Sequence, residues 1–107
     1  MGEIVVQRDD RGRIVGLVMR DLEEGSVATS SSQHFLQAVS ESLTQYLHVP
    51  AETSLTDEAF LSIDRKDAHL DRELDAVLET LVIGFRMLEK EYPSDLVVHE
   101  ATVGVEV

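Results

Sequence analysis

The residues best suited to chemistry are three consecutive serines that stand close to a histidine. Ser30, Ser31 and Ser32 precede a stretch with helical periodicity, and His34 follows two residues later. A serine nucleophile needs a base within hydrogen-bond reach and a third residue that orients the base. The Gly-x-Ser-x-Gly turn that presents such a serine does not occur in the sequence. Helix capping explains these serines better than catalysis does.

The carboxylates and histidines show no pattern typical of a metal or acid–base site. The sequence contains no His-Glu-x-x-His motif and no acidic calcium loop. Glu23 and Glu24 fall in a predicted loop, where solvent limits any shift in pKa. Asp71, Asp75 and Glu79 are expected to form a solvated helix face. Cysteine is absent, which excludes thiolate ligands and a cysteine nucleophile, so we expect no metal and no cofactor.

The net charge excludes several classes of partner. The chain has 21 Asp and Glu against 9 Lys and Arg, a formal charge of −12. Such a surface repels nucleic acid and anionic membranes. No apolar run approaches the ~20 residues that span a bilayer, and charged residues interrupt the N-terminal segment where a signal peptide would be apolar. We therefore expect a cytoplasmic protein that binds neither nucleic acid nor membrane.

The elements that must position these residues begin with a hairpin. Residues 3–8 and 14–19 are rich in β-branched residues, and the polar segment 9–13 between them contains a glycine that favours a turn. Residues 21–32 lack periodicity and are predicted to form a long loop, a length that is usually functional or mobile. Apolar residues at helical spacing then predict a helix over 33–48, which Pro50 ends.

The second half of the chain repeats this order of elements without repeating its sequence. Residues 52–55 and 59–63 are predicted to form another hairpin, with its turn at 56–58. A continuous apolar face predicts a long helix over 67–91. Strand material follows at 96–98 and 103–107. The order β-β-α-β-β-α-β predicts a single α+β domain over 1–107, with a mainly antiparallel sheet and both helices on one face.

This order of elements, together with three local patterns, resembles the bacterial ribosomal-processing cysteine protease family, Prp. In that family a strand like 13–19 runs into a Gly-His-Ala turn that bears the catalytic histidine; here Leu22 stands at that position. The family's first helix opens as Asp-Ile-Val-Cys-Ala-Ala-Val-Ser. Residues 33–40 match its final Ala-Val-Ser, with Leu36 in place of the cysteine. The family's Glu-x-Glu-Tyr-Pro, at the end of its second helix, is present at 89–93.

The resemblance implies a Prp-like protein without protease activity, because Leu22 and Leu36 cannot replace a catalytic histidine and cysteine. Members of the family are homodimers that trim the N-terminal extension of a large-subunit ribosomal protein. By resemblance we expect a homodimer that binds a basic ribosomal-protein extension beneath a loop containing Glu23, Glu24, Gly25, Ser30, Ser31 and Ser32. The acidic surface would attract such a partner. The alternative is an unrelated small acidic α+β module that acts in interaction or assembly through its sheet edge.

Overall fold

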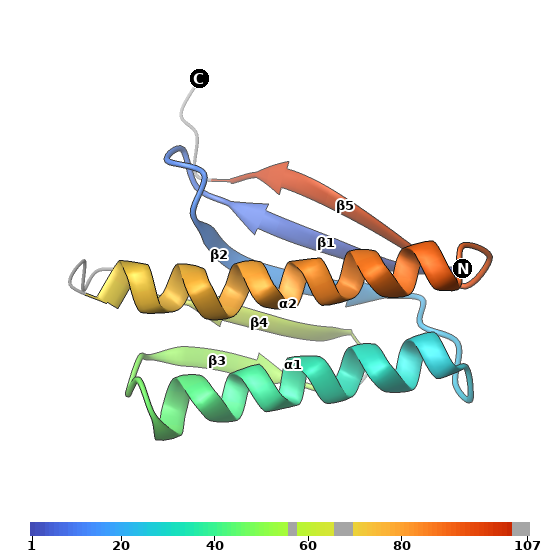
Figure 1. Ribbon diagram of the computed structural model, residues 1–107, viewed down its shortest axis with the longest axis horizontal. Helices are drawn as coiled ribbons and strands as arrows, with labels where there is room; N and C mark the ends of the chain where they lie inside the picture. Colours follow the sequence, from blue (N-terminus) through green and yellow to red (C-terminus); the bar gives the residue numbers. More distant parts are fainter. Residues whose placement is uncertain (56–57, 66–69, 104–107) are drawn as a thin grey trace.

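The computed structural model describes residues 1–55, 58–65 and 70–103. The five strands are β1 (Gly2–Arg8), β2 (Ile14–Arg20), β3 (Ala51–Ser54), β4 (Ala59–Ile63) and β5 (Leu96–Thr102). The two helices are α1 (Val27–Gln45) and α2 (Asp71–Glu91). Figure 1 shows these elements in the predicted order β-β-α-β-β-α-β. The predicted α+β class is therefore confirmed.

The strands form one mixed sheet in the order β3-β4-β2-β1-β5. Three of the four pairings are antiparallel, and β1 and β5 pair in parallel, from Gly2 opposite Leu96 to Arg8 opposite Thr102. Parallel neighbours need a long crossover connection, and here everything between β1 and β5 serves as that crossover. The first and last strands of the chain thus lie side by side, with β5 at one edge of the sheet and β3 at the other.

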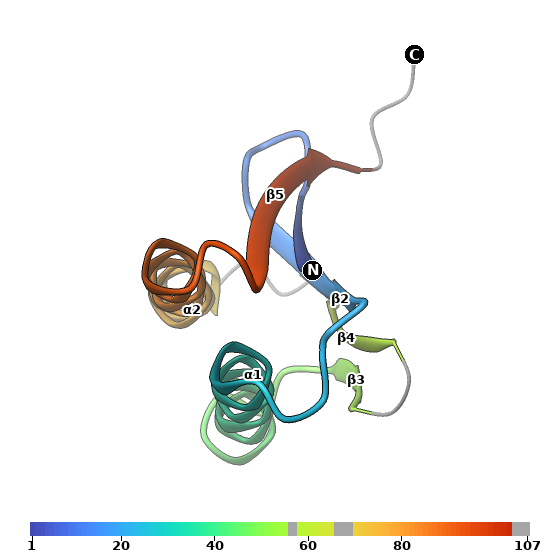
Figure 2. The same cartoon turned by 90° about the vertical axis from the view of Figure 1, so that its right-hand side faces the viewer.

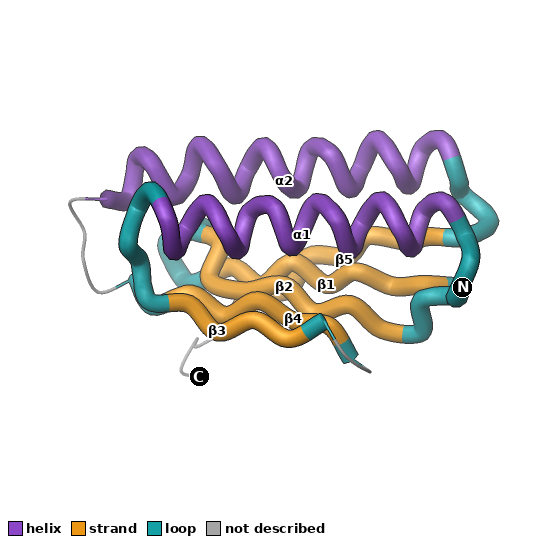
Figure 3. The backbone as a smooth tube through the Cα atoms, turned by 90° about the horizontal axis from the view of Figure 1, so that it is seen from below, coloured by secondary structure: helices purple, strands orange, loops and turns teal. Residues whose placement is uncertain are grey.

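Both helices cover the same face of the sheet, as Figures 2 and 3 show. Alternate strand residues such as Ile4 and Val6 of β1 and Leu17 and Met19 of β2 are buried beneath the helices. The predicted apolar face of α2 supplies the other side of this core, with the buried residues Leu74, Leu78, Leu81, Val82, Phe85 and Leu88. Within the described residues, no helix is long and apolar enough to cross a membrane.

The start of α1 differs from the prediction. The helix begins at Val27, six residues before the predicted start, so the predicted loop over 21–32 is wrong beyond residue 26. The side chain of Ser26 caps the helix, because its Oγ accepts a hydrogen bond from the backbone N–H of Thr29 at 3.0 Å. Ser30, Ser31 and Ser32 are helical residues and not caps. Serine and threonine are weak helix formers, so this first turn carries little helical signal in the sequence.

Other boundaries shift by smaller amounts. α1 ends at Gln45, and His48 has a positive φ of 54° instead of continuing the helix. β3 lies one residue earlier than predicted, and β4 has the predicted bounds. β5 continues four residues beyond Val98 because it pairs with the whole length of β1. The predicted hairpin turn at 56–58, the first residues of the predicted helix over 67–91 and the predicted strand over 103–107 lie wholly or partly outside the described residues.

Candidate functional site

A surface pocket of about 700 Å³ lies where the chain passes from β2 into α1. Three segments build it: the β2–α1 connection, one side of the first two turns of α1, and the residue after β3. We call it the α1 pocket. Its lining residues are Leu22, Glu24, Gly25, Thr29, Ser30, Gln33 and Leu55. Of the site residues predicted from the sequence, the α1 pocket thus brings together Leu22, Glu24, Gly25 and Ser30.

The backbone of the β2–α1 connection is held in a defined turn. Gly25 has a φ of 90°, a conformation that glycine adopts without a steric penalty. The N–H of Ser26 donates to the carbonyl oxygen of Glu23 at 3.3 Å, and the Ser26 hydroxyl donates to Thr29 Oγ1 at 2.8 Å. These bonds fix the direction in which α1 leaves the connection, and they place Glu24 and Ser30 at the same pocket.

Leu22 contributes an apolar surface to the α1 pocket. Its side chain is half-buried and packs against the core. A Cβ atom added to Gly2 would come within 2.8 Å of Leu22 Cδ2, so Leu22 lies directly over the start of β1. A leucine side chain neither accepts nor donates a proton. The position at which the resemblance places a catalytic histidine therefore offers hydrocarbon to the pocket.

Leu36 lies elsewhere. Its side chain is fully buried in the core between the helices and the sheet, and it does not line the α1 pocket. The family signature opens its helix with the cysteine in fourth place, and the fourth residue of α1 is Ser30. Ser30 is exposed and lines the pocket.

The serines and the histidine do not form a nucleophile–base pair among the described hydrogen bonds. Nδ1 of His34 lies 2.7 Å from the backbone carbonyl oxygen of Ser30, so the ring is held by its own helix. Ser31 is half-buried, and neither it nor Ser32 lines the α1 pocket. Ser32 is fully buried, and its hydroxyl has no partner among the described residues. The expected serine cluster is thus divided between pocket, helix surface and core.

Acidic residues of the β2–α1 connection give the α1 pocket a negatively charged rim: Glu24 lines the pocket, and Asp21 and Glu23 are close to it in the sequence. Glu23 is exposed, and its carboxylate lies 3.9 Å from the N-terminal amine of Met1. Within the part of the chain that the structure describes, the exposed Asp21 and Glu24 have no ion-pair partner. The nearest arginine in the sequence, Arg20, pairs instead with Glu58 at 3.1 Å and with Glu3 at 3.7 Å. The rim therefore suits a cationic ligand.

Sequence reasoning missed three lining residues of the α1 pocket, namely Thr29, Gln33 and Leu55. Thr29 and Gln33 lie one turn apart on α1, a relationship that appears only when the helix begins at Val27. The signal that could have shown this is Gly25-Ser26, a residue that tolerates positive φ followed by a good N-cap. Leu55 follows β3, and the hairpin of β3 and β4 is joined to the rest of the sheet by the pairing of β4 with β2, which the local sequence does not reveal.

The acidic residues of α2 are not a solvated face, and that prediction is wrong. Asp71 Oδ2 accepts from Arg13 at 2.8 Å, and Glu79 accepts two hydrogen bonds from Arg8, at 2.6 and 3.0 Å. Arginines of the sheet layer therefore hold α2 through charge-assisted bonds. Because these arginines lie more than 50 residues away in the sequence, helical spacing alone could not reveal the pairing.

These ion pairs shift the pKa values of the carboxylates. The guanidinium of Arg13, supported by Arg65, holds the pKa of Asp71 below its ordinary value. Hydrogen bonds from Arg8 and Arg86 likewise lower the pKa of Glu100. Arg13 and Asp71 lie at the Ile14 end of β2, whereas the α1 pocket adjoins the Arg20 end. The ion pairs thus stabilise the packing of α2 and take no part in the pocket.

The described residues contain no group of three or more histidines and acids placed to hold a metal ion. A comparison with protein-family models finds no match, and none of the curated proteins matches. Solved structures do match. The essential ribosomal processing protease Prp from S. aureus, in complex with a substrate peptide, superposes with a TM-score of 0.81 over 94% of this chain and 100% of that chain, at 14% identity.

Two further solved structures give the same result. The S. aureus Prp with a covalently linked product peptide has a TM-score of 0.79 at 13% identity, and a hypothetical protein from Staphylococcus aureus has 0.75 at 12% identity. Each comparison covers 94% of this chain and 100% of the other. The resemblance to Prp inferred from the sequence is therefore confirmed at the level of the fold, which extends over nearly the whole chain.

Proposed function

We propose that this protein binds a basic peptide in the α1 pocket and does not hydrolyse it. The observation that carries the proposal is the composition of the pocket: an acidic rim at Glu24 surrounds a lining that contains neither cysteine nor histidine. The S. aureus Prp that shares this fold was solved with a substrate peptide. A pocket between the β2–α1 connection and α1 is thus compatible with a peptide ligand.

The absence of hydrolysis follows from the chemistry of the lining. Peptide cleavage needs a nucleophile and a base that takes its proton. Ser30 is the exposed hydroxyl in the pocket, and Leu22 provides no base. The imidazole of His34 is bound to the Ser30 carbonyl oxygen. Among the described residues, Glu24 included, no base forms a hydrogen bond with the Ser30 hydroxyl, so Ser30 lacks the activation that a serine nucleophile requires.

The ligand chemistry follows from charge and shape. Leu22 and Leu55 present apolar surface for a hydrophobic side chain, while Glu24 and the neighbouring Asp21 attract lysine or arginine. A basic segment with one or two apolar residues satisfies both. The N-terminal extension of a large-subunit ribosomal protein, which the family resemblance implies, belongs to this class.

A binding titration tests the proposal. We expect a fluorescently labelled basic extension peptide to bind saturably in an anisotropy assay and to dissociate as salt is added, because salt screens exposed charges. Glu24→Lys should weaken binding by about fivefold or more, since reversal of a rim charge replaces attraction with repulsion. Glu41→Lys, an equal charge change on an exposed α1 residue outside the pocket, should leave binding almost unchanged.

The same mixtures test hydrolysis. Mass spectrometry after long incubation should recover the intact peptide. Specific cleavage would overturn the non-hydrolytic part of the proposal. Absence of saturable binding, or equal losses in Glu24→Lys and Glu41→Lys, would overturn the assignment of the α1 pocket.

A further inference from the structure

The two edges of the sheet differ in what bonds to their outward backbone groups. β5 forms one edge, and there the backbone N–H of Val98 donates to the carboxylate of Glu89 on α2 at 2.7 Å. This carboxylate occupies a donor that a further strand would need, which is one way in which proteins protect an edge strand. β3 forms the other edge and has no such protection at the two residues described next.

The outward backbone groups of β3 belong to Ala51 and Thr53. In an antiparallel pair, residues bonded to the neighbouring strand alternate with residues whose backbone groups point away from it. The N–H of Asp64 donates to the carbonyl oxygen of Pro50 at 3.2 Å, so the bonded pairs that follow are those of Glu52 and Ser54 with β4. Among the described residues, nothing bonds to the outward backbone groups of Ala51 and Thr53. They are the groups to which an extended peptide can add.

A pocket lies at each end of this edge. Leu55, which follows β3, lines the α1 pocket. At the start of β3, a second pocket of about 400 Å³ includes Pro50, Ala51 and Glu52. The four residues of β3 span about 13 Å, so an extended segment of about six residues reaches from one pocket to the other. The candidate peptide site is therefore continuous with the free edge of β3.

The side of α1 next to β3 is polar and uncharged. Figure 3 shows α1 running alongside β3. Ser40 Oγ lies 2.7 Å from Thr53 Oγ1, and Gln33 lines the α1 pocket together with Leu55. Gln37 lies between Gln33 and Ser40 on the same side of the helix, because residues three and four apart share a face. A strand added to β3 would therefore run past hydrogen-bonding side chains without meeting a charge on this face.

The other face of an added strand would meet acidic side chains. Because the side chain of Thr53 faces α1, that of the neighbouring Glu52 projects from the opposite face of the sheet, where it is exposed. Asp64, which follows β4, lines the same pocket as Glu52. Alternate side chains of a strand lie on the same face, so lysine or arginine at every second position of the peptide would lie beside these acids.

We propose that the basic peptide binds as a further strand on the free edge of β3, with one end in the α1 pocket and with basic side chains at alternate positions. This inference rests on the function proposed above, and it adds the path of the peptide and the spacing of its charges. In such a complex the backbone hydrogen bonds provide affinity for many sequences. Glu24 and Glu52 select basic side chains.

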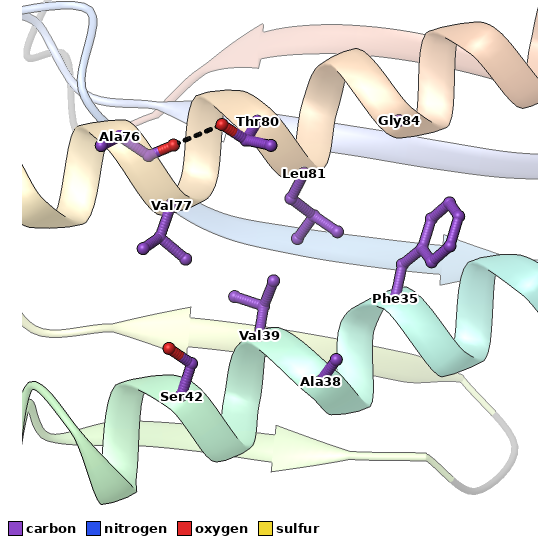
Figure 4. A pocket seen from close by; sticks show the side chains of 9 residues that line it. All are labelled: Phe35, Ala38, Val39, Ser42, Ala76, Val77, Thr80, Leu81 and Gly84. Atoms are coloured by element: carbon purple, nitrogen blue, oxygen red, sulfur yellow. Dashed lines mark hydrogen bonds between the residues drawn. The ribbon is translucent and has the colours of Figure 1, made fainter.

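An apolar groove on the opposite side of α1 is a rival position for the peptide. It has a volume of about 560 Å³ and lies between α1 and α2, where Figure 4 shows Val39 and Val77 directed toward each other. None of its lining residues is charged. Both of its walls are helices, whose backbone groups are bonded within the helix. The groove therefore offers a basic, extended peptide neither opposite charge nor backbone partners.

Amide hydrogen exchange of the full chain, followed by NMR with and without the basic extension peptide, tests the strand addition. The amides of Ala51 and Thr53 should exchange rapidly in the free protein and about tenfold or more slowly with saturating peptide, because the added strand accepts from them. Glu52 and Ser54 donate to β4 and should change little, as should Val98. Equal protection of all four β3 amides, or no protection while the anisotropy titration shows binding, would overturn the proposal.

Other occupants of the two surfaces give different results in the same experiment. Slow exchange of Ala51 and Thr53 that depends on the concentration of the free protein would show that a second copy occupies the edge. Peptide-induced shifts at Val39 and Val77 instead of β3 would place the peptide in the groove. Either result would overturn the proposal. Absence of any binding would overturn the proposed function and this inference with it, so failure of the strand alone is distinguishable.

A proline substitution tests the backbone contact directly. Thr53→Pro removes the outward N–H but keeps the β3–β4 ladder, because proline is tolerated on the open side of an edge strand. We expect the peptide to bind about fivefold more weakly. Thr53→Val is the matched control: it loses the hydroxyl that contacts Ser40 but keeps the N–H, and its affinity should stay within about twofold. Equal losses in the two variants would overturn the proposal.

A scan of the peptide gives the same information without a change in the protein. In a series of basic extension peptides, each N-methylated at one backbone amide, affinity should fall at every second position of the segment that pairs with β3. The intervening amides point away from β3 and should tolerate methylation. Losses at consecutive positions, or at none, would overturn the strand addition.

Discussion

Arg65 reaches from the end of β4 to the start of β2, where its Nε donates to the carbonyl oxygen of Ile14 at 2.9 Å. Its guanidinium also contacts Asp71 at 3.2 Å and Asp75 at 2.9 Å, both in the first turns of α2. Arg65 is only 8% exposed, the most deeply buried charged residue in the described chain. A single side chain thus joins the sheet to the N-terminal end of α2, where acids also favour the helix dipole.

Replacement of Arg65 should therefore cost stability. Arg65→Met keeps much of the side-chain volume but leaves the Ile14 carbonyl oxygen and Asp71 without this donor, and Asp75 without its ion-pair partner. We expect a loss of about 2–3 kcal/mol in the free energy of unfolding, below the range for a fully buried pair because the aspartates remain partly exposed. Urea denaturation measures it. Arg72→Met, an exposed arginine on α2, is the control and should change stability by less than about 0.5 kcal/mol.

Acid should weaken the fold through the carboxylates that pair with arginine. The pKa of Glu100 is lowered by hydrogen bonds from Arg8 and Arg86, and that of Asp71 by Arg13 and Arg65. Because these pKa values are lower in the folded state, the unfolded chain binds more protons over the window below the ordinary values of 4.5 and 3.8. Their contribution is complete above that window and is lost as the pH falls through the folded pKa values.

Thermal melts between about pH 7 and pH 3 check this dependence. The melting temperature of the protein should fall with pH more steeply than that of Glu100→Gln, which has no such proton to bind. The difference between the two melting temperatures at each pH removes the effect that neutralising an acidic surface has on both proteins. If the two curves remain parallel below pH 4.5, the ion pairs of Glu100 do not contribute to stability.

The helix cap at Ser26 should matter in the same assays. Ser26→Ala removes the oxygen that accepts from the Thr29 N–H, one of the four unpaired donors at the start of α1. The expected cost is about 1 kcal/mol. Ser26→Asp should retain most of the stability, because aspartate is an equally good cap and its charge favours the N-terminus of the helix. Equal losses in both variants would show that the hydroxyl does not act as the cap.

The sequence predicted what depends on local periodicity. The strands of both hairpins were predicted from a spacing of two residues, and the apolar faces of both helices from a spacing of three to four residues. The prediction placed β4 at its observed bounds. The first turn of α1 was missed because Thr29 to Ser32 are weak helix formers, stabilised here by the cap and by burial of Ala28. The ion pairs of Arg8 with Glu79 and of Arg13 with Asp71 were missed because the partners are more than 50 residues apart in the sequence.

In the candidate site, too, features that depend on near neighbours in the sequence were predicted, and features that depend on the tertiary structure were not. Leu22, Glu24, Gly25 and Ser30 were predicted and lie together, because a turn and a helix start bring near neighbours into one pocket. Leu36, which the Ala-Val-Ser match places at the signature cysteine, is fully buried in the core and does not line the pocket. Short letter matches carry no information on where a helix begins. The N-cap fixes that start, and with it the residues that face the pocket.

Ser32 provides the last prediction, on the inner side of the same helix. Its side chain is fully buried, and the hydroxyl has no hydrogen-bond partner among the described residues. A buried hydroxyl without a partner loses its bonds to water on folding, which costs about 1–3 kcal/mol. Ser32→Ala removes that cost and should raise the free energy of unfolding by about 1 kcal/mol, since a small cavity offsets part of the gain.

Ser31→Ala is the matched control: it makes the same change one residue earlier, at a half-buried position. Both gain the higher helix propensity of alanine, so the difference between them in urea denaturation reports the buried hydroxyl alone. A lower stability for Ser32→Ala than for Ser31→Ala would mean that the hydroxyl has a partner that stabilises the fold.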